Sequence, residues 1–264
     1  MQSDTNLPTP GIIKISVVII TFNEARNIGR CLNSVQDIAD EVLVIDSFST
    51  DKTEAICRSK GARFIQHPFG GHIEQKNVAL AQAQHDFILS LDADEALDDT
   101  LKRAILEVKQ SPAPASAYTM NRLTNYCGQW IRHSGWYPDR KLRLFDRRLG
   151  RWGGQNPHDR VEMHAHVEGK HLSGDLHHYS YYAVAEHWQR AERYATIAAQ
   201  AMYKHGQRST IFHRWVSPAF KFLRNYILKA GFLDGRAGWT ICRIAAVETW
   251  WKYQKLKEMT DAEH

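Results

Sequence analysis

An apolar run that stops at a cluster of carboxylates is the feature that most constrains this chain. Residues 86–95 read DFILSLDADE, so the apolar segment Phe87–Leu91 is followed at once by Asp92, Asp94 and Glu95. A run of this length suits a core strand of a parallel sheet. Open α/β sheets bind ligands outside the carboxyl ends of their strands, and two aspartates spaced i, i+2 can share a hard divalent cation that holds a diphosphate. The segment predicts a metal-dependent enzyme acting on a nucleotide-activated substrate.

Three other segments of strand composition precede this one and alternate with helical patterns. β-Branched residues fill 14–21, an apolar run covers 41–45, and a shorter strand is expected at 63–66. Apolar residues at helical spacing follow each of these segments, and they follow 87–91 as well. Strands that alternate with helices at short intervals predict a doubly wound, mostly parallel sheet, so the expected fold class is α/β.

The pattern changes after residue 112. Residues 118–121, 141–145 and 161–167 have strand patterns joined by irregular loops, and helical patterns take over in the last third of the chain. Ser217-Pro218 is expected to begin one of these helices, as its N-cap and first helical residue.

We expect two parts on this basis. Residues 1–205 would form one domain, with a nucleotide-binding half at about 14–112 and an acceptor half at about 113–205. Residues 206–264 would form a helical, basic and aromatic tail, which is the C-terminal extension of the domain.

The distribution of charge and aromatic residues sets this tail apart. The net charge of the chain is +5, and from Lys204 to Lys257 eleven Lys and Arg residues stand against the two acids Asp234 and Glu248. All eight tryptophans lie at or after Trp130. Cations together with aromatic rings suit an anionic bilayer surface, although packing of the rings within the protein is the alternative. Nucleic acid is not an expected partner, because no recognised binding module accompanies the charge.

The cysteines and the hydropathy pattern favour a cytoplasmic protein. The four cysteines are scattered and form no Cys-x-x-Cys pair, which is typical of reduced thiols. The apolar stretch 12–20 carries Lys14 and leads into a polar turn, so it is expected to be neither a signal peptide nor a membrane span.

The chain has no glycine-rich phosphate-binding motif. Neither Gly-x-x-x-x-Gly-Lys-Ser/Thr nor Gly-x-Gly-x-x-Gly follows the first expected strand. A bound diphosphate would therefore need a cation, expected to be Mg²⁺ or Mn²⁺, with Asp92 and Asp94 as ligands. The alternative is that these acids cap the next helix, a role for which Asp98 and Asp99 are better placed.

The first hundred residues resemble a known family. Four motifs carry the resemblance, in its order and spacing: SVVIITFNE (16–24), EVLVIDSFSTDKT (41–53), Gln75-Lys76-Asn77 and FILSLDADE (87–95). They resemble the family 2 inverting glycosyltransferases, which have the GT-A fold. The second half, with YPDRKLRLFDR at 137–147 and GDLHHYSY at 174–181, resembles the bacterial lipopolysaccharide core β-glucosyltransferases.

The resemblance implies a pocket for a nucleotide-sugar. Its lining would consist of Thr21, Asn23, Glu24, Asp46, Asn77, Asp92 and Ala93. Asp46 would meet the uracil, Asp92 the ribose and the metal, and Asp94 would be the principal metal ligand. From local sequence alone, Asp46 could equally be a turn or cap residue. Ser47 stands where family members often carry a second acid, which leaves the ribose contact open.

An inverting transfer needs a base on the side opposite the departing nucleotide. Similar sequences often have His-Glu where this chain has His158-Asp159, so Asp159 is the expected base and Asp175 the runner-up. A surface ion pair is the alternative role for Asp159. His158, Arg140 and Arg143 are further expected contacts of the diphosphate or of an anionic acceptor, with solvated strand charges as the alternative.

The resemblance therefore implies an inverting glycosyltransferase that moves a sugar, expected to be glucose, from a UDP-sugar donor to a lipid-linked oligosaccharide such as the lipopolysaccharide inner core. Its expected location is peripheral, on the cytoplasmic face of the inner membrane and against its anionic surface. Two alternatives stay open at this stage: a nucleotidyltransferase, which would release pyrophosphate, and a non-catalytic membrane-binding module.

Overall fold

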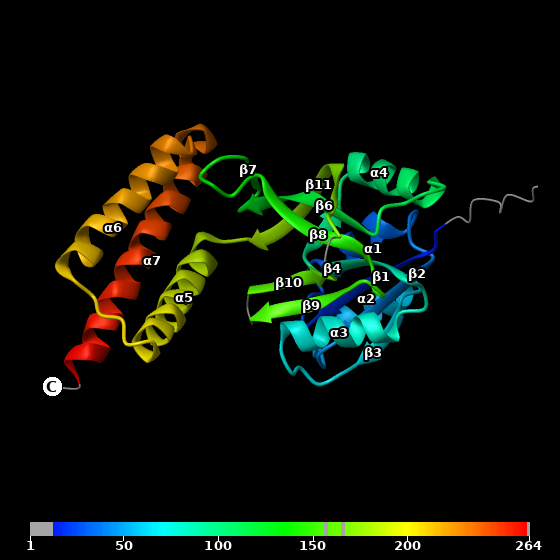
Figure 1. Ribbon diagram of the computed structural model, residues 1–264, viewed down its shortest axis with the longest axis horizontal. Coiled ribbons are helices and arrows are strands. Elements are labelled where there is room, and N and C mark those ends of the chain that lie inside the picture. Colours follow the sequence, from blue (N-terminus) through cyan, green and yellow to red (C-terminus); the bar gives the residue numbers. More distant parts are fainter. Residues whose placement is uncertain (1–12, 156–157, 165–166, 263–264) are drawn as a thin grey trace, which may run out of the picture. The chain divides into compact units, whose positions relative to one another are not determined.

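The computed structural model describes residues 13–155, 158–164 and 167–262 (Figure 1). Contacts within the chain group it into two compact units. Unit 1 comprises residues 1–122 and 140–178, and unit 2 comprises residues 123–139 and 179–264. The functional boundary expected between residues 205 and 206 stays a prediction.

Strands and helices alternate through the first part of the chain, as expected. The elements up to residue 110 are β1 (Ile15–Thr21), α1 (Ile28–Val35), β2 (Glu41–Asp46), α2 (Thr53–Ser59), β3 (Arg63–Gln66), α3 (His72–Gln82), β4 (Phe87–Asp92), β5 (Glu95–Leu97) and α4 (Asp99–Gln110). The later strands are β6 (Ala117–Tyr126), β7 (Gln129–Ile131), β8 (Asp139–Asp146), β9 (Gly150–Gln155), β10 (His158–Met163) and β11 (Lys170–Tyr181). The strand expected over 161–167 thus ends at Met163, and residues 165 and 166 lie outside the described part.

The central strands form a parallel sheet with the order β3-β2-β1-β4. Its register pairs Thr21 with Asp46, and Ile20 with Asp92. Because parallel strands run in the same direction, Thr21, Asp46 and Asp92 meet at one edge of the sheet, outside which α/β proteins bind ligands. β8 then joins β4 in antiparallel fashion, and the order continues through β6, β11 and β5. The predicted α/β class with a mostly parallel sheet is confirmed.

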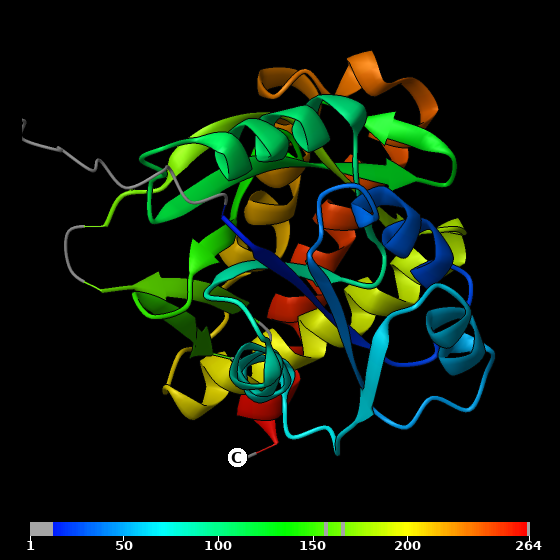
Figure 2. The same ribbon diagram turned by 90° about the vertical axis from the view of Figure 1, so that its right-hand side faces the viewer.

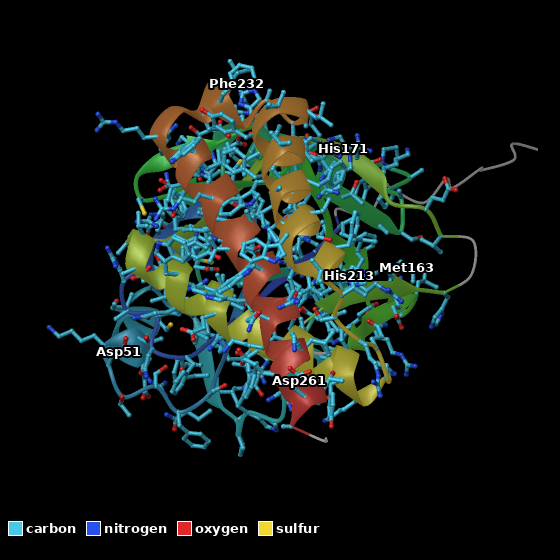
Figure 3. All side chains as sticks on the ribbon, turned by 90° about the vertical axis from the view of Figure 1, so that its left-hand side faces the viewer. Asp51, Met163, His171, His213, Phe232 and Asp261 are labelled. Atoms are coloured by element: carbon cyan, nitrogen blue, oxygen red, sulfur yellow. The ribbon has the colours of Figure 1, made fainter. Side chains whose placement is uncertain are left out.

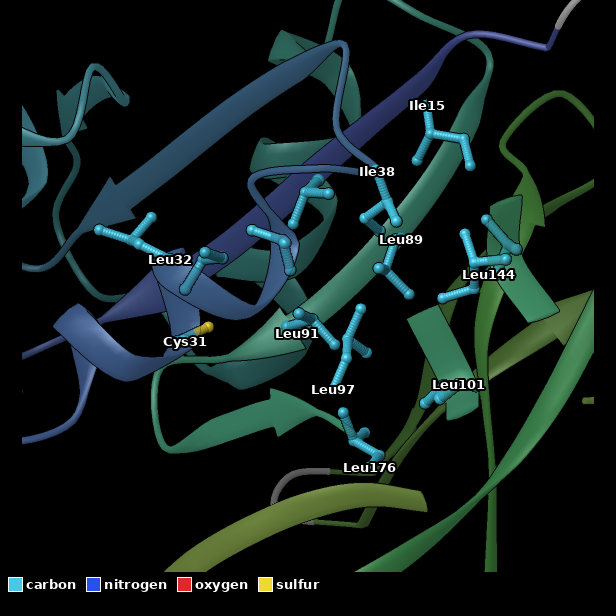
Figure 4. Packing of buried hydrophobic residues seen from close by; sticks show 14 of the residues in the cluster. Ile15, Cys31, Leu32, Ile38, Leu89, Leu91, Leu97, Leu101, Leu144 and Leu176 are labelled. Atoms are coloured by element: carbon cyan, nitrogen blue, oxygen red, sulfur yellow. The ribbon is translucent and has the colours of Figure 1, made fainter. Parts of the chain in front are cut away.

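The strands of unit 1 bury both of their faces. Alternating residues of β1 point to opposite sides, so Val17 and Ile19 join the core beneath α1 and α4, whereas Val18 joins the core beneath α3. Figure 4 shows part of the first core, and Figure 2 shows α4 and α3 on opposite sides of the strands. Because both faces of these strands are buried, the strand segments are nearly continuous apolar runs.

Asp98 caps α4. Its side chain accepts a hydrogen bond from the backbone N–H of Leu101 at 2.7 Å, and its own N–H donates to the carbonyl of Asp175 at 3.1 Å. The capping role expected for the 98–99 pair is therefore taken by Asp98. Asp92 and Asp94 are not used as caps of this helix.

Unit 2 is built mainly from helices. They are α5 (Val184–Lys204), α6 (Ile211–Leu223), the π-helical turn η1 (Arg224–Leu228), the 3₁₀ turn η2 (Gly231–Asp234) and α7 (Gly235–Asp261). Among the described residues, none of the helices combines the length and the apolar character that a membrane crossing requires.

The prediction that Ser217-Pro218 begins a helix is wrong. α6 begins at Ile211, after Thr210, whose hydroxyl accepts a hydrogen bond from the N–H of His213 at 3.2 Å. Pro218 lies inside this helix, where it removes one backbone hydrogen bond. A threonine cap and an uninterrupted apolar pattern before the proline outweigh the preference of proline for the first helical position.

An aromatic cluster encloses His187 in unit 2. The ring of His187 lies 5.3, 5.7 and 4.7 Å from the rings of Tyr126, Trp136 and Tyr181, and its Nδ1 is 3.1 Å from the Tyr126 hydroxyl. Burial, with a smaller contribution from the charge of Arg190, lowers the pKa of His187 to about 4. The imidazole is neutral at pH 7.

We expect acid to destabilise unit 2 through His187. The unfolded chain takes up a proton on this histidine near pH 6.5, whereas the folded protein resists protonation down to about pH 4. The contribution of His187 to the free energy of unfolding is therefore fully present above pH 6.5. It falls by up to about 3 kcal/mol as the pH is lowered toward 4. Chemical denaturation at a series of pH values, followed by tryptophan fluorescence, measures the dependence of the unfolding free energy on pH. The slope of this dependence should be smaller in His187→Gln. The exposed His205→Gln should keep it; equal slopes in both variants would contradict the assignment.

Candidate active site

Charged side chains gather where β4 ends. Four carboxylates, one lysine, two arginines and one histidine take part: Asp92, Asp94, Glu95, Asp159, Lys76, Arg122, Arg143 and His178. They come from α3, β4, β5, β6, β8, β10 and β11, all within unit 1. The sheet topology therefore assembles a cluster that no single stretch of sequence contains.

Lys76 links two of the predicted functional acids. Its Nζ lies 2.9 Å from Asp92 Oδ1 and 2.7 Å from Asp159 Oδ2. The lysine is buried, with 3% of its surface exposed, and its ammonium group sits 4.2 Å from the ring centre of Trp152. A buried ammonium needs such partners, because desolvation of an unpaired charge is costly.

Arg143 holds the other side of Asp92. Its Nη2 donates to Asp92 Oδ2 at 2.9 Å and to Glu95 Oε1 at 2.7 Å. Glu95 Oε2 accepts a hydrogen bond from the backbone N–H of Asp92 at 3.0 Å, and Arg122 lies 3.7 Å from Glu95 Oε1. Each oxygen of the Asp92 carboxylate thus has a cation, and the backbone at the end of β4 is fixed as well.

These contacts keep Asp92 and Arg143 ionised. Burial favours the neutral form of Asp92, but the positive charges of Lys76 and Arg143 outweigh it and hold the pKa of that carboxyl well below its usual range. Burial opposes the charge on Arg143, yet Glu95 and Asp92 raise the pKa of its guanidinium further. Asp92 and Arg143 therefore carry opposite charges at neutral pH.

Asp94 and His178 form the pair best suited to a metal ion. Asp94 Oδ2 lies 3.3 Å from His178 Nε2, which β11 brings there by pairing His178 with Glu95. Burial alone would raise the pKa of Asp94, but the charge and hydrogen bond of His178 lower it. Within the described residues no three metal-ligating side chains converge. A carboxylate and an imidazole that leave other positions to a diphosphate and water fit a cation that the substrate helps to bind.

Three buried polar atoms around this cluster lack hydrogen-bond partners in the described part of the chain. They are Thr21 Oγ1, Arg143 Nε and Trp152 Nε1. Buried polar atoms are almost always satisfied, so a group of exceptions at one place is a signal for ligand or solvent atoms. Thr21 is the first of the predicted donor-site residues, and its strand end adjoins that of Asp92 through Ile20.

Asp46 and Asn23 organise the neighbouring loops. Asp46 is fully buried, and its carboxylate accepts hydrogen bonds from the N–H of Ser49 at 2.7 Å and from its hydroxyl. Asn23 has the left-handed φ of 53°; its N–H donates to Ser49 Oγ at 2.8 Å and its Oδ1 accepts from the N–H of Thr50 at 2.8 Å. These bonds fix the shape of the strand-end loops, and the nucleotide contacts assigned to both residues stay predictions.

Glu24 and Ser47 also have protein partners. The backbone N–H of Glu24 donates to Thr53 Oγ1 at 2.9 Å, and its carboxylate accepts from the side chain of Asn27 at 2.8 Å. Ser47 accepts a hydrogen bond from Gln75 Nε2 at 3.1 Å. The serine therefore connects the loop after β2 to α3.

Other predicted residues are placed away from the charge cluster or are otherwise engaged. The side-chain amide of Asn77 bonds both the carbonyl and the N–H of Trp152, at 2.9 and 3.1 Å, so it attaches β9 to α3. Arg140 is exposed, unlike Arg143. Asp175 lies an odd number of residues from His178 on β11 and so faces the other side of the sheet.

Two predicted residues remain. Ala93 is buried between Asp92 and Asp94, with 4% of its surface exposed. His158 lies in β10 beside Asp159, and its side chain is outside the described part of the structure.

The sequence analysis did not predict Lys76, Glu95, Arg122 and His178 as site residues. A signal for Lys76 was present, because it shares a helical face with Ala79, Leu80 and Ala83, which are all buried. A lysine on an apolar face is rarely buried without a partner. His178 gave no local signal, because its position depends on the register between β11 and β5.

Replacing Lys76 with methionine should destabilise unit 1. Methionine keeps the length of the side chain but leaves Asp92 and Asp159 without their shared cation, which should lower the free energy of unfolding by about 3–5 kcal/mol. Lys102→Met is a matched control, because Lys102 pairs with the exposed Asp99 and its loss should cost less than about 1 kcal/mol. Urea denaturation at pH 7 measures both, and similar values would show that the Lys76 contacts contribute no more than a surface pair.

Residues 16–167 match the family described as glycosyl transferase family 2. A glycosyltransferase of Rickettsia bellii is 30% identical, over 94% of this chain and 87% of its own length. A lipopolysaccharide core biosynthesis glycosyltransferase, LpsC, of Rhizobium meliloti is 27% identical, over 89% of this chain and 88% of its own length. Glucosyl-3-phosphoglycerate synthase from Mycobacterium tuberculosis, solved with Mn²⁺ and UDP, has 24% identity and a TM-score of 0.35, and covers 43% of this chain and 44% of that one. The match over more than half of its residues shows that this chain belongs to glycosyl transferase family 2.

Proposed function

We propose that this glycosyltransferase transfers a sugar, with glucose as the first choice, from a UDP-sugar to a lipid-linked oligosaccharide such as the lipopolysaccharide inner core, with inversion. One observation carries the proposal. Lys76 contacts both Asp92, the acid assigned to the donor, and Asp159, the acid assigned to the acceptor hydroxyl. Transfer of a sugar requires that a group that binds the donor lies next to a group that activates the acceptor hydroxyl. The relative involved in lipopolysaccharide core biosynthesis supports the acceptor class.

The proposed reaction is a single displacement. The acceptor hydroxyl oxygen forms a bond to the anomeric carbon while the bond from that carbon to the diphosphate oxygen breaks. The electron pair of the broken bond leaves with UDP, and the hydroxyl proton passes to the carboxylate of Asp159. Attack from the side opposite UDP inverts the anomeric configuration.

The protein prepares this displacement with fixed charges. Lys76 keeps Asp159 and Asp92 at a set separation, and Arg143 fixes the second oxygen of Asp92, so neither carboxylate has to reorganise during the reaction. A Mg²⁺ or Mn²⁺ held by Asp94 and His178 would supply positive charge to the departing diphosphate. Trp152, buried under Lys76, keeps water from the inner side of the cluster.

The alternative of a nucleotidyltransferase makes a different product. It would attack phosphorus and release pyrophosphate, whereas glycosyl transfer releases UDP. Family membership supports the second outcome, and measurement of the released product separates the two.

Asp159→Asn should reduce turnover about 10²–10⁴-fold without loss of UDP binding. Asparagine can still accept a hydrogen bond from Lys76, so the cluster keeps its geometry, but the amide cannot take a proton. The assay measures UDP release from UDP-glucose in the presence of Mn²⁺ and purified lipopolysaccharide core, and isothermal titration calorimetry measures UDP binding.

Glu162→Gln is the matched control, because Glu162 lies on the same strand and pairs with the exposed Arg160. It should retain full turnover. EDTA should abolish transfer by the native protein. Undiminished turnover in Asp159→Asn would remove Asp159 as the base, and release of pyrophosphate in place of UDP would overturn the proposed reaction.

We further propose that the acceptor lies in a bilayer that unit 2 contacts, at the cytoplasmic face of the inner membrane. No residue of α6 is buried. Large apolar side chains are exposed along α6, η1 and η2: Ile211, Phe212, Trp215, Val216, Phe220, Leu223, Ile227, Leu228, Phe232 and Leu233. Phe232 marks the end of this surface in Figure 3.

An apolar face of this size, next to many cations, has the composition of an interfacial membrane-binding helix. Arg208 precedes this stretch of chain, Arg214 lies within it and Arg236 follows it, so anionic headgroups are the complementary partner.

Serine at Trp215 and Leu228 should weaken binding to vesicles of phosphatidylcholine and phosphatidylglycerol by about tenfold or more, since each side chain loses a large apolar area. Ile197→Ser on α5 is the control, because Ile197 is exposed but lies outside this apolar surface. Co-sedimentation measures the partition coefficient. Unchanged partition of the double variant, or dimerisation of the native protein through this face in analytical ultracentrifugation, would contradict the membrane assignment.

A further inference from the structure

Unit 2 contains a cavity lined by an excess of cations. Its volume is about 430 Å³. The basic side chains in its lining are Lys221, Arg224, Lys229 and Lys252, and Glu248 is the one carboxylate among the lining residues. All of the lining residues belong to unit 2, so the cavity is a feature of that unit alone.

Helical spacing brings these groups together. Lys221, Arg224 and Asn225 are spaced i, i+3, i+4 across the junction of α6 and η1, and Glu248 and Lys252 are spaced i, i+4 on α7. α6 and α7 pack against each other along their length (Figure 1). The π-helical turn η1 begins at Arg224, and such turns are rare and frequently mark functional sites.

The positive charge of the cavity is not neutralised within the described part of the chain. Among the described residues, no carboxylate oxygen lies within 4.0 Å of a side-chain nitrogen of any of its four basic residues. His187 also lines the cavity and is neutral at pH 7. Burial lowers the pKa of Lys221, and the charges of Arg224, Lys252 and Lys229 lower it further, while the charge of Glu248 acts in the opposite direction.

We propose that this cavity is a binding site for a phosphate-bearing group, either a phosphomonoester or a pyrophosphate. Four cations against one carboxylate match a ligand with at least two negative charges. The side-chain amide of the buried Asn225 adds a neutral hydrogen-bonding group to the lining. Arg224 supplies the planar donor set that binds phosphate in a bidentate manner.

The size and walls of the cavity allow more than a bare ion. Its volume lies in the range of about 300–1,000 Å³ typical of sites for small molecules. Trp136 and Tyr181 line another part of it and offer apolar surface to whatever carries the phosphate. The ligand could be the headgroup of an anionic lipid or a phosphorylated compound in solution. The site does not depend on the reaction proposed for unit 1.

Isothermal titration calorimetry with inorganic pyrophosphate, in EDTA, tests the site without the metal of unit 1. We expect the native protein to bind, and Arg224→Gln to raise the dissociation constant about ten- to hundredfold, because one charge-assisted contact is lost. Arg236→Gln removes the same charge from α7 outside the cavity and should leave the constant unchanged. A parallel titration uses phosphatidylcholine vesicles with and without phosphatidic acid.

The two titrations identify the source of the phosphate. Binding of pyrophosphate that Arg224→Gln weakens, with no effect of this change on vesicle binding, indicates a soluble ligand. An effect of Arg224→Gln on binding to the phosphatidic acid vesicles indicates a headgroup. The proposal is overturned if the native protein binds neither probe, or if Arg236→Gln weakens binding as much as Arg224→Gln.

A second measurement excludes damage to the fold. Because the cations repel one another without ligand, Lys221→Gln should leave the melting temperature unchanged or raise it, while it weakens pyrophosphate binding. UDP binding in Mn²⁺ should be the same as in the native protein. A fall in melting temperature together with lost binding of both pyrophosphate and UDP would show that these residues serve the fold and would overturn the proposal.

Discussion

The contact of one ammonium group with two carboxylates determines the arrangement of the active-site region. Lys76 lies between Asp92 at the end of β4 and Asp159 on β10, and the apolar ring of Trp152 lies under it. Buried charges are tolerated only when they are paired, so the position of each acid is set by the lysine and by Arg143. A transferase that handles a diphosphate benefits from this arrangement, since fixed charges need no reorganisation when charge moves.

Most of the fold and part of the candidate active site could be predicted from local sequence patterns. The alternation of apolar strands with helical patterns was enough to predict the parallel sheet, and the acids after Phe87–Leu91 marked its functional edge. The partners of those acids were not readable, because Arg143 and His178 reach them through antiparallel strands whose register the sequence does not display. The start of α6 was misplaced for a different reason: the Thr210 cap and the apolar pattern before Pro218 outweigh the preference of proline for the first helical position.

The two units divide different tasks between different kinds of structure. Unit 1 places charged groups on and around strand ends, where a sheet holds them rigidly. Unit 2 presents helices with exposed apolar side chains and a cavity of unneutralised cations. The arrangement of unit 1 suits chemistry on a polar nucleotide. The arrangement of unit 2 suits a partner that has both an apolar part and negative charge.

The long separation between Lys76 and Asp159 has a consequence for how the molecule is made. The two residues are 83 positions apart, and the strand that carries Asp159 leaves the ribosome after the parallel strands of unit 1 are complete. Contacts between distant parts of a chain close slowly, because the intervening loop must first lose its freedom. A nascent chain that ends before β10 can pair Lys76 with Asp92 alone, so the second ion pair of this lysine forms only after the parallel strands have been made.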